Sequence, residues 1–471
     1  MDGRSLPNIV LVLCDTLGAK HMSLHGYERR TTPYLERMVE DDCFVSYQRC
    51  LAPASWTIPS HASLFTGLYP SEHNVGDDRV FLPGNMYCLA EILKYLGYVT
   101  FGVTSNGLVS RLLNFHRGFD EFYEMWHFFN SEEFLMVEEA FGRSKKDVKG
   151  EFARFLLLMR LALSNGSYAF LLKKPVDSAY KKFFSILKKS VHATLRTMNT
   201  AKKIIVSRDT QKPFFLFLNI METHNQYNPP SDIKAFGEIS PGTRNEALKK
   251  CEADHYAHAP FSNDIFEALN VLYDREVLFL DSVLWDFYSF LKGKGSLDNT
   301  LFIITSDHGE LLGEHGQVNH VFTLYNELLH IPLLVKFPRD FAMRGCKDGL
   351  VQLHDIFSTI TDVAGSPLPT PDSSHSLLSS VPRKTAYSQL LSCDHTLHKF
   401  RRENPSFVSQ DYMQPYSSLV TDEMKKIIKR ADGHIEMYDL EKDLYETREL
   451  SGDPAYSGEK AGLLQLLEKV H

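Results

Sequence analysis

Short apolar runs alternate along the chain with longer segments in which apolar residues recur at helical spacing. The apolar runs are bounded by polar or turn residues, as expected of strands that are buried on both faces. Because such strands alternate with amphipathic segments, the pattern predicts an α/β fold with a large, mostly parallel sheet flanked by helices. The predicted strands are Ile9–Cys14, Val99–Val103, Phe214–Ile220, Leu301–Thr305 and Ile331–Phe337, and the clearest predicted helices are Pro33–Val39, Leu89–Leu96 and Ile265–Leu291.

The pattern changes after residue 365. Residues 366–380 are rich in proline and serine, which is typical of a linker. Short strand-like pieces follow, with a hairpin that turns at Ala431–Gly433, and a helical pattern ends the chain at 459–470. We therefore expect a large α/β domain over residues 1–365 and a smaller C-terminal α+β subdomain over 366–471. The strands expected in the subdomain are Thr385–Leu390, Ser418–Thr421, Met424–Lys429 and Ile435–Tyr438.

A basic segment interrupts the large domain at about 142–205. Between residues 143 and 203 there are 15 Lys and Arg residues against 3 Asp and Glu residues, although the whole chain has a net charge of −8. Lysine pairs recur there among Phe, Leu and Met residues, which favours a helical insertion. Its basic face is either simply solvated or a surface for peripheral contact with anionic lipid or a polyanionic substrate.

Overall composition excludes several classes of protein. The 471 residues include 51 Lys+Arg and 59 Asp+Glu, whereas nucleic-acid-binding proteins usually have a basic excess. The seven cysteines are scattered and form no CxxC pair, which favours reduced thiols over a disulfide framework or a zinc knuckle. No uncharged apolar run approaches the roughly 20 residues of a membrane span, and no signal peptide is recognisable. We therefore expect a cytoplasmic protein that does not bind nucleic acid.

Carboxylates and an imidazole follow two of the predicted strands. Asp15 comes directly after the first strand, and Asp307–His308 follow the strand at 301–305. Ligands of such sheets bind beyond the carboxyl ends of the strands, so these side chains are expected to converge there. Two carboxylates and an imidazole match the ligands of a divalent cation. Taken alone, Asp307–His308 would equally suit the start of a helix.

A hydroxyl group marks the start of another predicted helix. Proline is favoured in a first helical turn and glycine at a helix end, so the sequence predicts a helix from about Pro59 to Gly67. Thr57 then lies at the N-terminus of that helix, where unpaired N–H groups and the helix dipole favour negative charge. Such a position suits either a simple helix cap or an oxygen nucleophile.

Five motifs occur in an order that is known from one family of hydrolases. Through them the chain resembles the sulfatase family of the alkaline phosphatase superfamily, over roughly residues 7–130 and 212–450. The motifs are Asp15–Leu17, Trp56–His61, Met221–His224, Ser306–Gly316 and Tyr438–Asp443.

The resemblance implies an alkaline phosphatase-like fold and a site for one divalent metal ion, which is Mn, Zn, Mg or Ca. It implies that Thr57 is the nucleophile, that His224 faces the leaving group or a substrate oxygen, and that His320 contacts the transferred group. The implied metal ligands are Asp15, Thr57, Asp307 and His308.

The nucleophile position departs from the family pattern. Sulfatases carry Cys or Ser there, which is oxidised to formylglycine, and Arg at the position of His61. Oxidation of Thr57 would give a ketone, so the aldehyde-hydrate chemistry is not available to it. A threonine alkoxide is what the nucleotide pyrophosphatase/phosphodiesterases and the phosphoglycerol or phosphoethanolamine transferases of the superfamily use. Because water can resolve a Thr-phosphate more readily than a Thr-sulfate, the departure favours phosphoester chemistry.

The metal site and the substrate site depart as well. Thr16 stands where many sulfatases have a second aspartate, and fewer carboxylates favour Mn, Zn or Mg over Ca. No Lys-x-His pair is visible after the strand at 99–103; Asn106 lies roughly there, and with His61 it is expected to bind substrate. A second metal ion would need further ligands, for which the candidates are Glu222, His224 and His320.

Together these inferences predict a metal-dependent hydrolase that cleaves a phosphate, phosphonate or sulfate ester, with phosphoesters favoured, through Thr57 and a covalent intermediate. The expected substrate is a small-molecule, glycan or lipid ester. Three alternatives stay open: a phospho-group transferase that uses a lipid-linked or glycan acceptor, a sulfuric ester hydrolase of the arylsulfatase type, and a binding protein that has lost catalysis.

Overall fold

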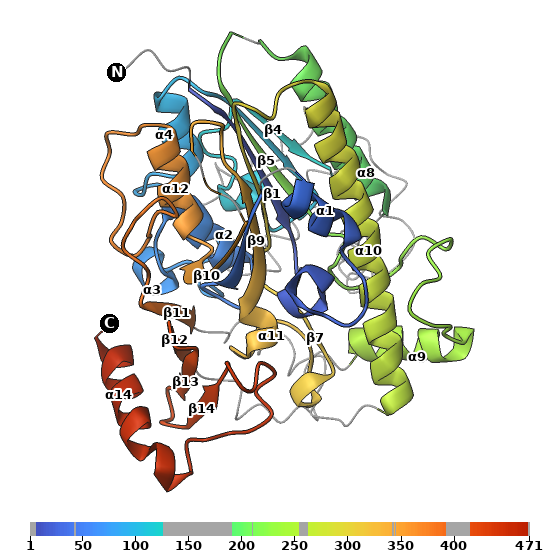
Figure 1. Cartoon of the computed structure of the whole chain (residues 1–471), viewed down its shortest axis with the longest axis vertical. Coiled ribbons are helices and arrows are strands. Elements are labelled where there is room, and N and C mark those ends of the chain that lie inside the picture. The colour runs from blue at the N-terminus through green and yellow to red at the C-terminus, as the bar shows by residue number, and fades with distance from the viewer. Residues whose placement is uncertain are drawn as a thin grey trace, which may run out of the picture.

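An eight-stranded sheet forms the centre of the protein, as the computed structural model shows (Figure 1). Its strands, in spatial order, are β10 (Gly345–Gln352), β2 (Val45–Leu51), β9 (His330–Lys336), β6 (Thr300–Thr305), β1 (Asn8–Cys14), β5 (Phe214–Ile220), β3 (Val99–Thr104) and β4 (Glu121–Glu124). β9 runs antiparallel to its neighbours β2 and β6, and every other pair of neighbours is parallel. The structure describes residues 6–41, 44–125, 191–209, 211–253, 262–341, 343, 345–391 and 415–469.

Helices cover both faces of this sheet (Figure 1). One face carries α2 (Thr57–Thr66), α4 (Leu89–Tyr95) and α12 (Asp355–Val363), whereas the other carries α1 (Pro33–Asp41), α8 (Val191–Ser207) and the long α10 (Asn263–Gly293). Shorter or peripheral helices are α3 (Pro70–His73), α9 (Pro241–Ala253) and α11 (Asn326–Leu329). Among the described residues, no helix is both long and apolar enough to span a membrane.

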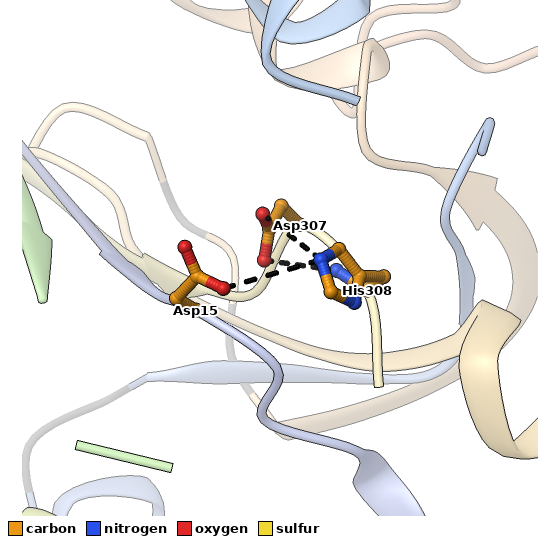
Figure 2. A group of neighbouring side chains, drawn as sticks. All are labelled: Asp15, Asp307 and His308. Carbon is orange, nitrogen blue, oxygen red and sulfur yellow. Dashed lines mark hydrogen bonds and ion pairs between the residues drawn. The ribbon is translucent and has the colours of Figure 1, made fainter. Parts of the chain in front are cut away.

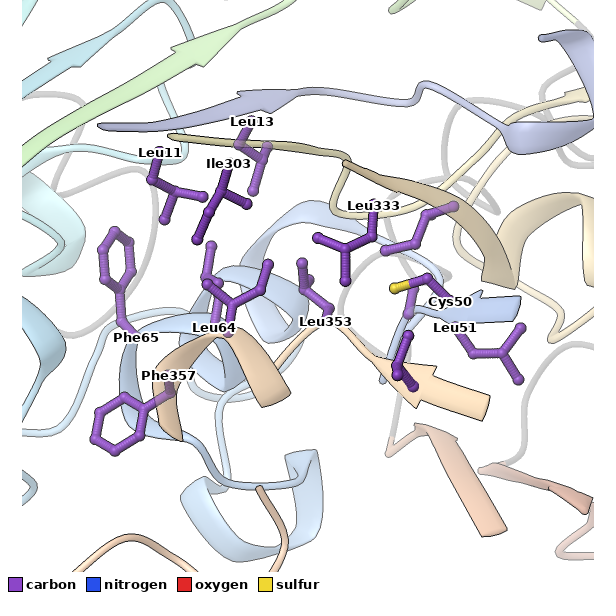
Figure 3. Packing of buried hydrophobic residues seen from close by; sticks show 14 of the residues in the cluster. Leu11, Leu13, Cys50, Leu51, Leu64, Phe65, Ile303, Leu333, Leu353 and Phe357 are labelled. Atoms are coloured by element: carbon purple, nitrogen blue, oxygen red, sulfur yellow. The ribbon is translucent and has the colours of Figure 1, made fainter. Parts of the chain in front are cut away.

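The alternation of side chains along β1 explains why the apolar runs look continuous. Ile9, Leu11 and Leu13 pack with residues of α2 and α12, and the intervening residues of β1 pack with α1, α8 and α10. Successive strand residues point to opposite faces, and here both faces are covered. Figure 3 shows the first of these two layers, in which Leu11 and Leu13 approach Leu64 and Phe65 of α2.

The C-terminal subdomain is an antiparallel sheet with one helix packed on it. Its strands are β11 (Thr385–Leu390), β12 (Tyr416–Thr421), β13 (Lys425–Arg430) and β14 (Ile435–Asp439), and its helix is α14 (Ser457–Glu468). It joins the main domain next to the segment that precedes α2, where Gln389 N donates to Pro53 O at 2.9 Å and Ser388 Oγ donates to Ala52 O at 2.6 Å. A two-stranded ribbon, β7 (Leu311–Leu312) and β8 (Val318–Asn319), lies in the sequence between β6 and β9 of the main sheet.

The predicted fold class is confirmed, and each predicted strand lies within two residues of an observed one. Three strands of the main sheet, β2, β4 and β10, were not predicted, because polar residues interrupt their apolar pattern. Of the predicted basic insertion, residues 142–190 lie outside the described part of the chain. Its last part forms α8, where Met198, Ala201 and Ile205 are buried against the sheet, so this helix belongs to the main domain.

Candidate active site

Two neighbouring strands deliver the acidic residues of the site. β1 and β6 pair in parallel, with Leu13 opposite Thr305, so their carboxyl ends lie side by side. Asp15 follows β1 directly, and Asp307 follows β6 after one intervening serine. The predicted convergence of these residues at the sheet edge is therefore observed, and Asp307–His308 lie in a loop rather than at the start of a helix.

Tight backbone packing holds the two loops in place. A Cβ atom added to Gly309 would lie 2.0 Å from the backbone oxygen of Glu327 and 3.2 Å from Gly18 Cα, so only glycine fits there. Leu17 N donates to Ser306 Oγ at 2.9 Å, which binds one loop to the other. The Asp15 and Asp307 side chains thus have little freedom to move apart.

Thr57 is the first residue of α2, as predicted, although the helix begins two residues before Pro59. Every residue of α2 is buried, and Gly67, with a φ of 75°, ends the helix in the left-handed conformation that favours glycine. The Thr57 hydroxyl lies at the positive end of the helix dipole, 3.5 Å from His308 Nε2. α2 therefore carries the hydroxyl into the cluster formed by the two loops.

Asp15, Asp307 and His308 form a compact cluster of metal-ligand type (Figure 2). Their ligand atoms all lie within 4.8 Å of one another. His308 Nε2 is 3.4 Å from Asp307 Oδ2 and 3.9 Å from Asp15 Oδ1. His308 Nδ1 donates to the Gly309 carbonyl at 2.9 Å, which leaves the lone pair of Nε2 directed at the two carboxylates.

The charges of the side chains in this cluster favour the binding of a cation. Burial, and next the charge of Asp307, raise the pKa of Asp15 to about 6, and burial raises the pKa of Asp307 to about 7. Burial, followed by the neighbouring His320, lowers the pKa of His308 to about 3, so its imidazole is neutral near pH 7. Within the described residues, Asp15 Oδ1 and Asp307 Oδ2 are buried and have no hydrogen-bond partner. Two uncompensated carboxylate oxygens and a neutral imidazole nitrogen fit a divalent metal ion.

Asn106, which we expected to contact substrate, contacts a proposed metal ligand, and the substrate contact stays a prediction. Asn106 Nδ2 donates to Asp15 Oδ2 at 2.5 Å, and Asn106 Oδ1 accepts from the backbone of Leu108 at 2.8 Å. Both polar groups of this side chain are therefore engaged within the protein. Hydrogen bonds of this kind fix the orientation of a ligating carboxylate.

His61 lies inside the protein, one turn along α2 from Thr57. Its Nδ1 donates to the Thr57 carbonyl at 2.9 Å and lies 3.4 Å from Asp307 Oδ2. Burial lowers the pKa of His61 to about 3, so its ring is neutral. Nε2 then accepts from Asn219 Nδ2 at 3.4 Å. These contacts steady the start of α2, and the substrate contact expected of His61 stays a prediction.

Two further histidines, His224 and His320, adjoin the cluster, and the roles expected of them stay predictions. The His320 ring centroid lies 4.5 Å from that of His308 and 5.2 Å from that of His224. His320 Nδ1 is 2.8 Å from Glu310 Oε1, and His224 Nδ1 donates to the Asn225 carbonyl at 2.6 Å. In each ring the partner fixes Nδ1, so Nε2 is the atom that would exchange a proton.

Three residues that shape the site were not identified from the sequence. Glu310 is buried and orients His320, Asn219 contacts His61, and Tyr273 of α10 donates to the Thr16 carbonyl at 2.6 Å. Glu310 lies in the Ser306–Gly316 motif, which was a usable signal. The other two lie in apolar segments where nothing in the local pattern marks them.

A mostly parallel sheet with acidic and histidine ligands at its carboxyl edge, and a hydroxyl group at a helix N-terminus, defines an α/β ester-bond hydrolase. The chain belongs to the sulfatase family, whose model matches residues 7–366. A second model, described as N-sulphoglucosamine sulphohydrolase, C-terminal, matches residues 313–471. The resemblance stated from the sequence motifs is thereby confirmed.

The curated relatives differ in how much of this chain they cover. Arylsulfatase K of Danio rerio is 23% identical over 81% of this chain and 69% of its own length. N-acetylglucosamine-6-O-sulfatase of Bacteroides thetaiotaomicron is 20% identical over 98% of this chain and 86% of its own length. Arylsulfatase K of Canis lupus familiaris is 31% identical, over only 39% of this chain and 38% of its own length.

Solved structures share the fold. The phosphonate monoester hydrolase of Agrobacterium radiobacter has a TM-score of 0.69 at 17% identity, with 98% of this chain and 95% of that chain covered. A protein solved in complex with its substrate, D-glucosamine-2-N,6-O-disulfate, has a TM-score of 0.65 at 18% identity, with 99% and 97% covered.

Proposed function

We propose that the protein is a metal-dependent hydrolase of phosphate or phosphonate esters that uses Thr57 as its nucleophile. The observation that carries the proposal is the position of the Thr57 hydroxyl, at the N-terminus of a buried helix and 3.5 Å from His308 Nε2 in a cluster of metal-ligand type. The other hydroxyl groups of that helix lie further along it, so Thr57 is the expected nucleophile.

Asp15, Asp307 and His308 would hold the metal ion, with the Thr57 hydroxyl as a further ligand. A divalent ion bound there would lower the pKa of that hydroxyl and offset negative charge on the transferred group. The two buried carboxylates account for the charge of such an ion, and the His308 ligand favours Mn or Zn over Ca.

Side chains of the protein carry out the nucleophilic attack and the proton transfers. Thr57 loses its hydroxyl proton to solvent, and Oγ1 attacks phosphorus in line, which forms an Oγ1–P bond and breaks the bond from phosphorus to the leaving oxygen. That oxygen takes a proton from Nε2 of His320 or His224. Water then attacks the same phosphorus and breaks the Oγ1–P bond, and one proton of that water returns to the histidine. The Thr57 alkoxide takes its hydroxyl proton back from solvent. The N–H groups at the start of α2 stabilise charge on the phosphoryl oxygens.

One argument favours phosphorus over sulfur as the reacting centre: Thr57 cannot form the aldehyde hydrate through which formylglycine sulfatases release sulfate. The fold is compatible with either centre, because a phosphonate monoester hydrolase and a sulfatase are both among the structural neighbours. The names of the curated relatives favour the alternative, a sulfate ester hydrolase. A small-molecule or glycan ester is the substrate class that we propose, in line with the neighbour solved with a glucosamine disulfate.

A substrate panel tests the proposal. Wild type, Thr57→Ala and Thr57→Ser are assayed on nitrophenyl phosphate monoester, phosphodiester, phosphonate and sulfate, with Mn²⁺, Zn²⁺, Mg²⁺ and Ca²⁺ in turn. We expect phosphorus esters to be preferred, Thr57→Ser to retain turnover and Thr57→Ala to lose at least about 10³-fold of it. Mass spectrometry of the quenched reaction should locate a phosphoryl group on the peptide that carries Thr57. Preferred turnover of sulfate that survives in Thr57→Ala would refute both the nucleophile and the chemistry.

A further inference from the structure

A second cluster of metal-ligand side chains lies where the C-terminal subdomain meets the main domain. It comprises His315 from the turn between β7 and β8, Glu327 from α11, and Glu446 from the loop after β14. The ligand atoms of these three residues all lie within 4.8 Å of one another. We propose that this cluster, the junction site, binds a divalent transition-metal cation independently of the active site.

The junction site opens into a cavity of its own. A cavity of about 490 Å³ is lined by the three residues of the junction site together with Lys20, Phe266, Tyr445 and others. The active-site residues Asp15, Thr57, Asp307 and His308 are not part of its lining. A cation can therefore reach the junction site without passing the catalytic cluster.

Glu327, which is one of the residues that line this cavity, has an unsatisfied side-chain oxygen. Its side chain is only 1% exposed, and its Oε2 lies 3.2 Å from His315 Nε2. Its Oε1 is buried and accepts no hydrogen bond from any part of the chain that the structure describes. A buried carboxylate oxygen without a donor is costly, and a bound cation would remove that cost.

Two lysines near the junction site are already paired with carboxylates other than Glu327, one of which, Glu446, belongs to the junction site itself. Lys20 forms an ion pair with Glu314. Lys426 Nζ lies 2.5 Å from Glu446 Oε1 and donates to the Leu324 carbonyl at 2.7 Å. His315 is thus the neighbour that faces the carboxylate of Glu327. The His315 ring stacks on Tyr325, with the ring centroids 3.8 Å apart. One imidazole and two carboxylates are a ligand set suited to Zn²⁺ or Mn²⁺.

Metal stoichiometry tests the junction site directly. The full chain is stripped with chelator, dialysed against Zn²⁺ and analysed for bound metal. Wild type should hold two equivalents, one in each site, and Asp307→Asn should keep the junction equivalent. Glu327→Gln and His315→Ala should each lose one equivalent, whereas the matched control Glu314→Gln, which removes a charge from the same cavity, should keep both. Circular dichroism confirms that each variant is folded, and His315→Ala is the milder change because that side chain is 16% exposed.

Thermal unfolding provides a second readout that does not depend on activity. Because the junction site joins residues of both domains, Zn²⁺ should raise the Tm of Asp307→Asn by several degrees and leave Asp307→Asn/Glu327→Gln unchanged. Three results would overturn the proposal: a Zn²⁺ count in Asp307→Asn of zero, an unchanged count in both Glu327→Gln and His315→Ala, or an equal loss in Glu314→Gln. If only the active site failed to bind metal, the protein would still bind one equivalent of Zn²⁺ at the junction site, so the two outcomes can be told apart.

Discussion

Replacing Asp307 by asparagine tests how the raised pKa of this buried carboxyl group makes the stability of the protein depend on pH. In the metal-free protein, burial raises the pKa of Asp307 from 3.8 to about 7. The folded protein therefore binds this proton more tightly than the unfolded chain does. The resulting contribution to stability is fully present below the unfolded pKa and is lost as the pH rises through the folded pKa. Asparagine keeps the shape of the side chain and has no proton to lose.

The size of the effect follows from the shift. About three pH units correspond to about 4 kcal/mol over the whole range, of which roughly 2.5 kcal/mol falls between about pH 5 and about pH 8. In the presence of chelator, wild type should thus lose roughly 2.5 kcal/mol of unfolding free energy relative to Asp307→Asn over that interval. The histidines with lowered pKa values titrate alike in both proteins, so the comparison cancels them. Asp15, which repels Asp307, adds to the effect in the same direction.

Urea unfolding at several pH values, with chelator and with saturating Mn²⁺, measures both parts of this prediction. A bound ion favours the ionised carboxylates. Mn²⁺ should therefore raise the unfolding free energy of wild type most strongly at the higher pH, and that of Asp307→Asn less. Asp286→Asn, an exposed carboxylate that pairs with Lys202, is the matched control and should show neither effect. In chelator, the unfolding free energy of wild type relative to Asp307→Asn should fall as the pH rises. A difference that does not change with pH, or that increases in favour of wild type, would contradict a raised pKa of Asp307.

Three further predictions concern the structure around the site. Gly309→Ala forces a Cβ atom against backbone and should cost at least about 3 kcal/mol of stability in urea unfolding, whereas Gly84→Ala, with nothing within 4 Å of the new atom, should cost under about 1 kcal/mol. Asp281→Ala removes the acceptor of two backbone N–H groups, at 2.8 and 2.9 Å, from the start of α1 and should cost about 2–4 kcal/mol, and an equally stable variant would contradict that role. Asn106→Ala frees Asp15 Oδ2 and should weaken Mn²⁺ binding about 10- to 100-fold in calorimetry, with little change in stability; unchanged affinity would show that the contact is incidental.

The main sheet was predictable because its central strands are buried on both faces. β5, Phe214–Ile220, is apolar at all but one position, and its bounds were predicted without error. β2, Val45–Leu51, carries Ser, Gln and Arg within seven residues, so its place in the sheet depends on its neighbours β10 and β9 rather than on its own pattern. β4 is only four residues long, which is too short for a periodic signal.

The site was predictable where its residues follow strands or begin helices. Asp15, Asp307 and Thr57 have such positions, and the rules that place ligands at strand ends and helix starts apply to them. The contacts of Asn106 and His61 were not predictable in this way, because a sequence does not tell whether a polar side chain faces a cavity or a neighbouring residue. Both turned out to bond within the protein.

The burial of α2 along its whole length has a consequence for how the protein unfolds. A surface helix frays at its ends, but α2 has no exposed residue and touches both the sheet and α12, so it cannot open without disrupting the packing around it. Amide deuterium exchange in this helix should therefore report global unfolding, with the slowest rates found in the molecule. The position of the Thr57 hydroxyl, the proposed nucleophile, would then be lost only with the whole domain, and heat inactivation should coincide with the cooperative melting of the sheet.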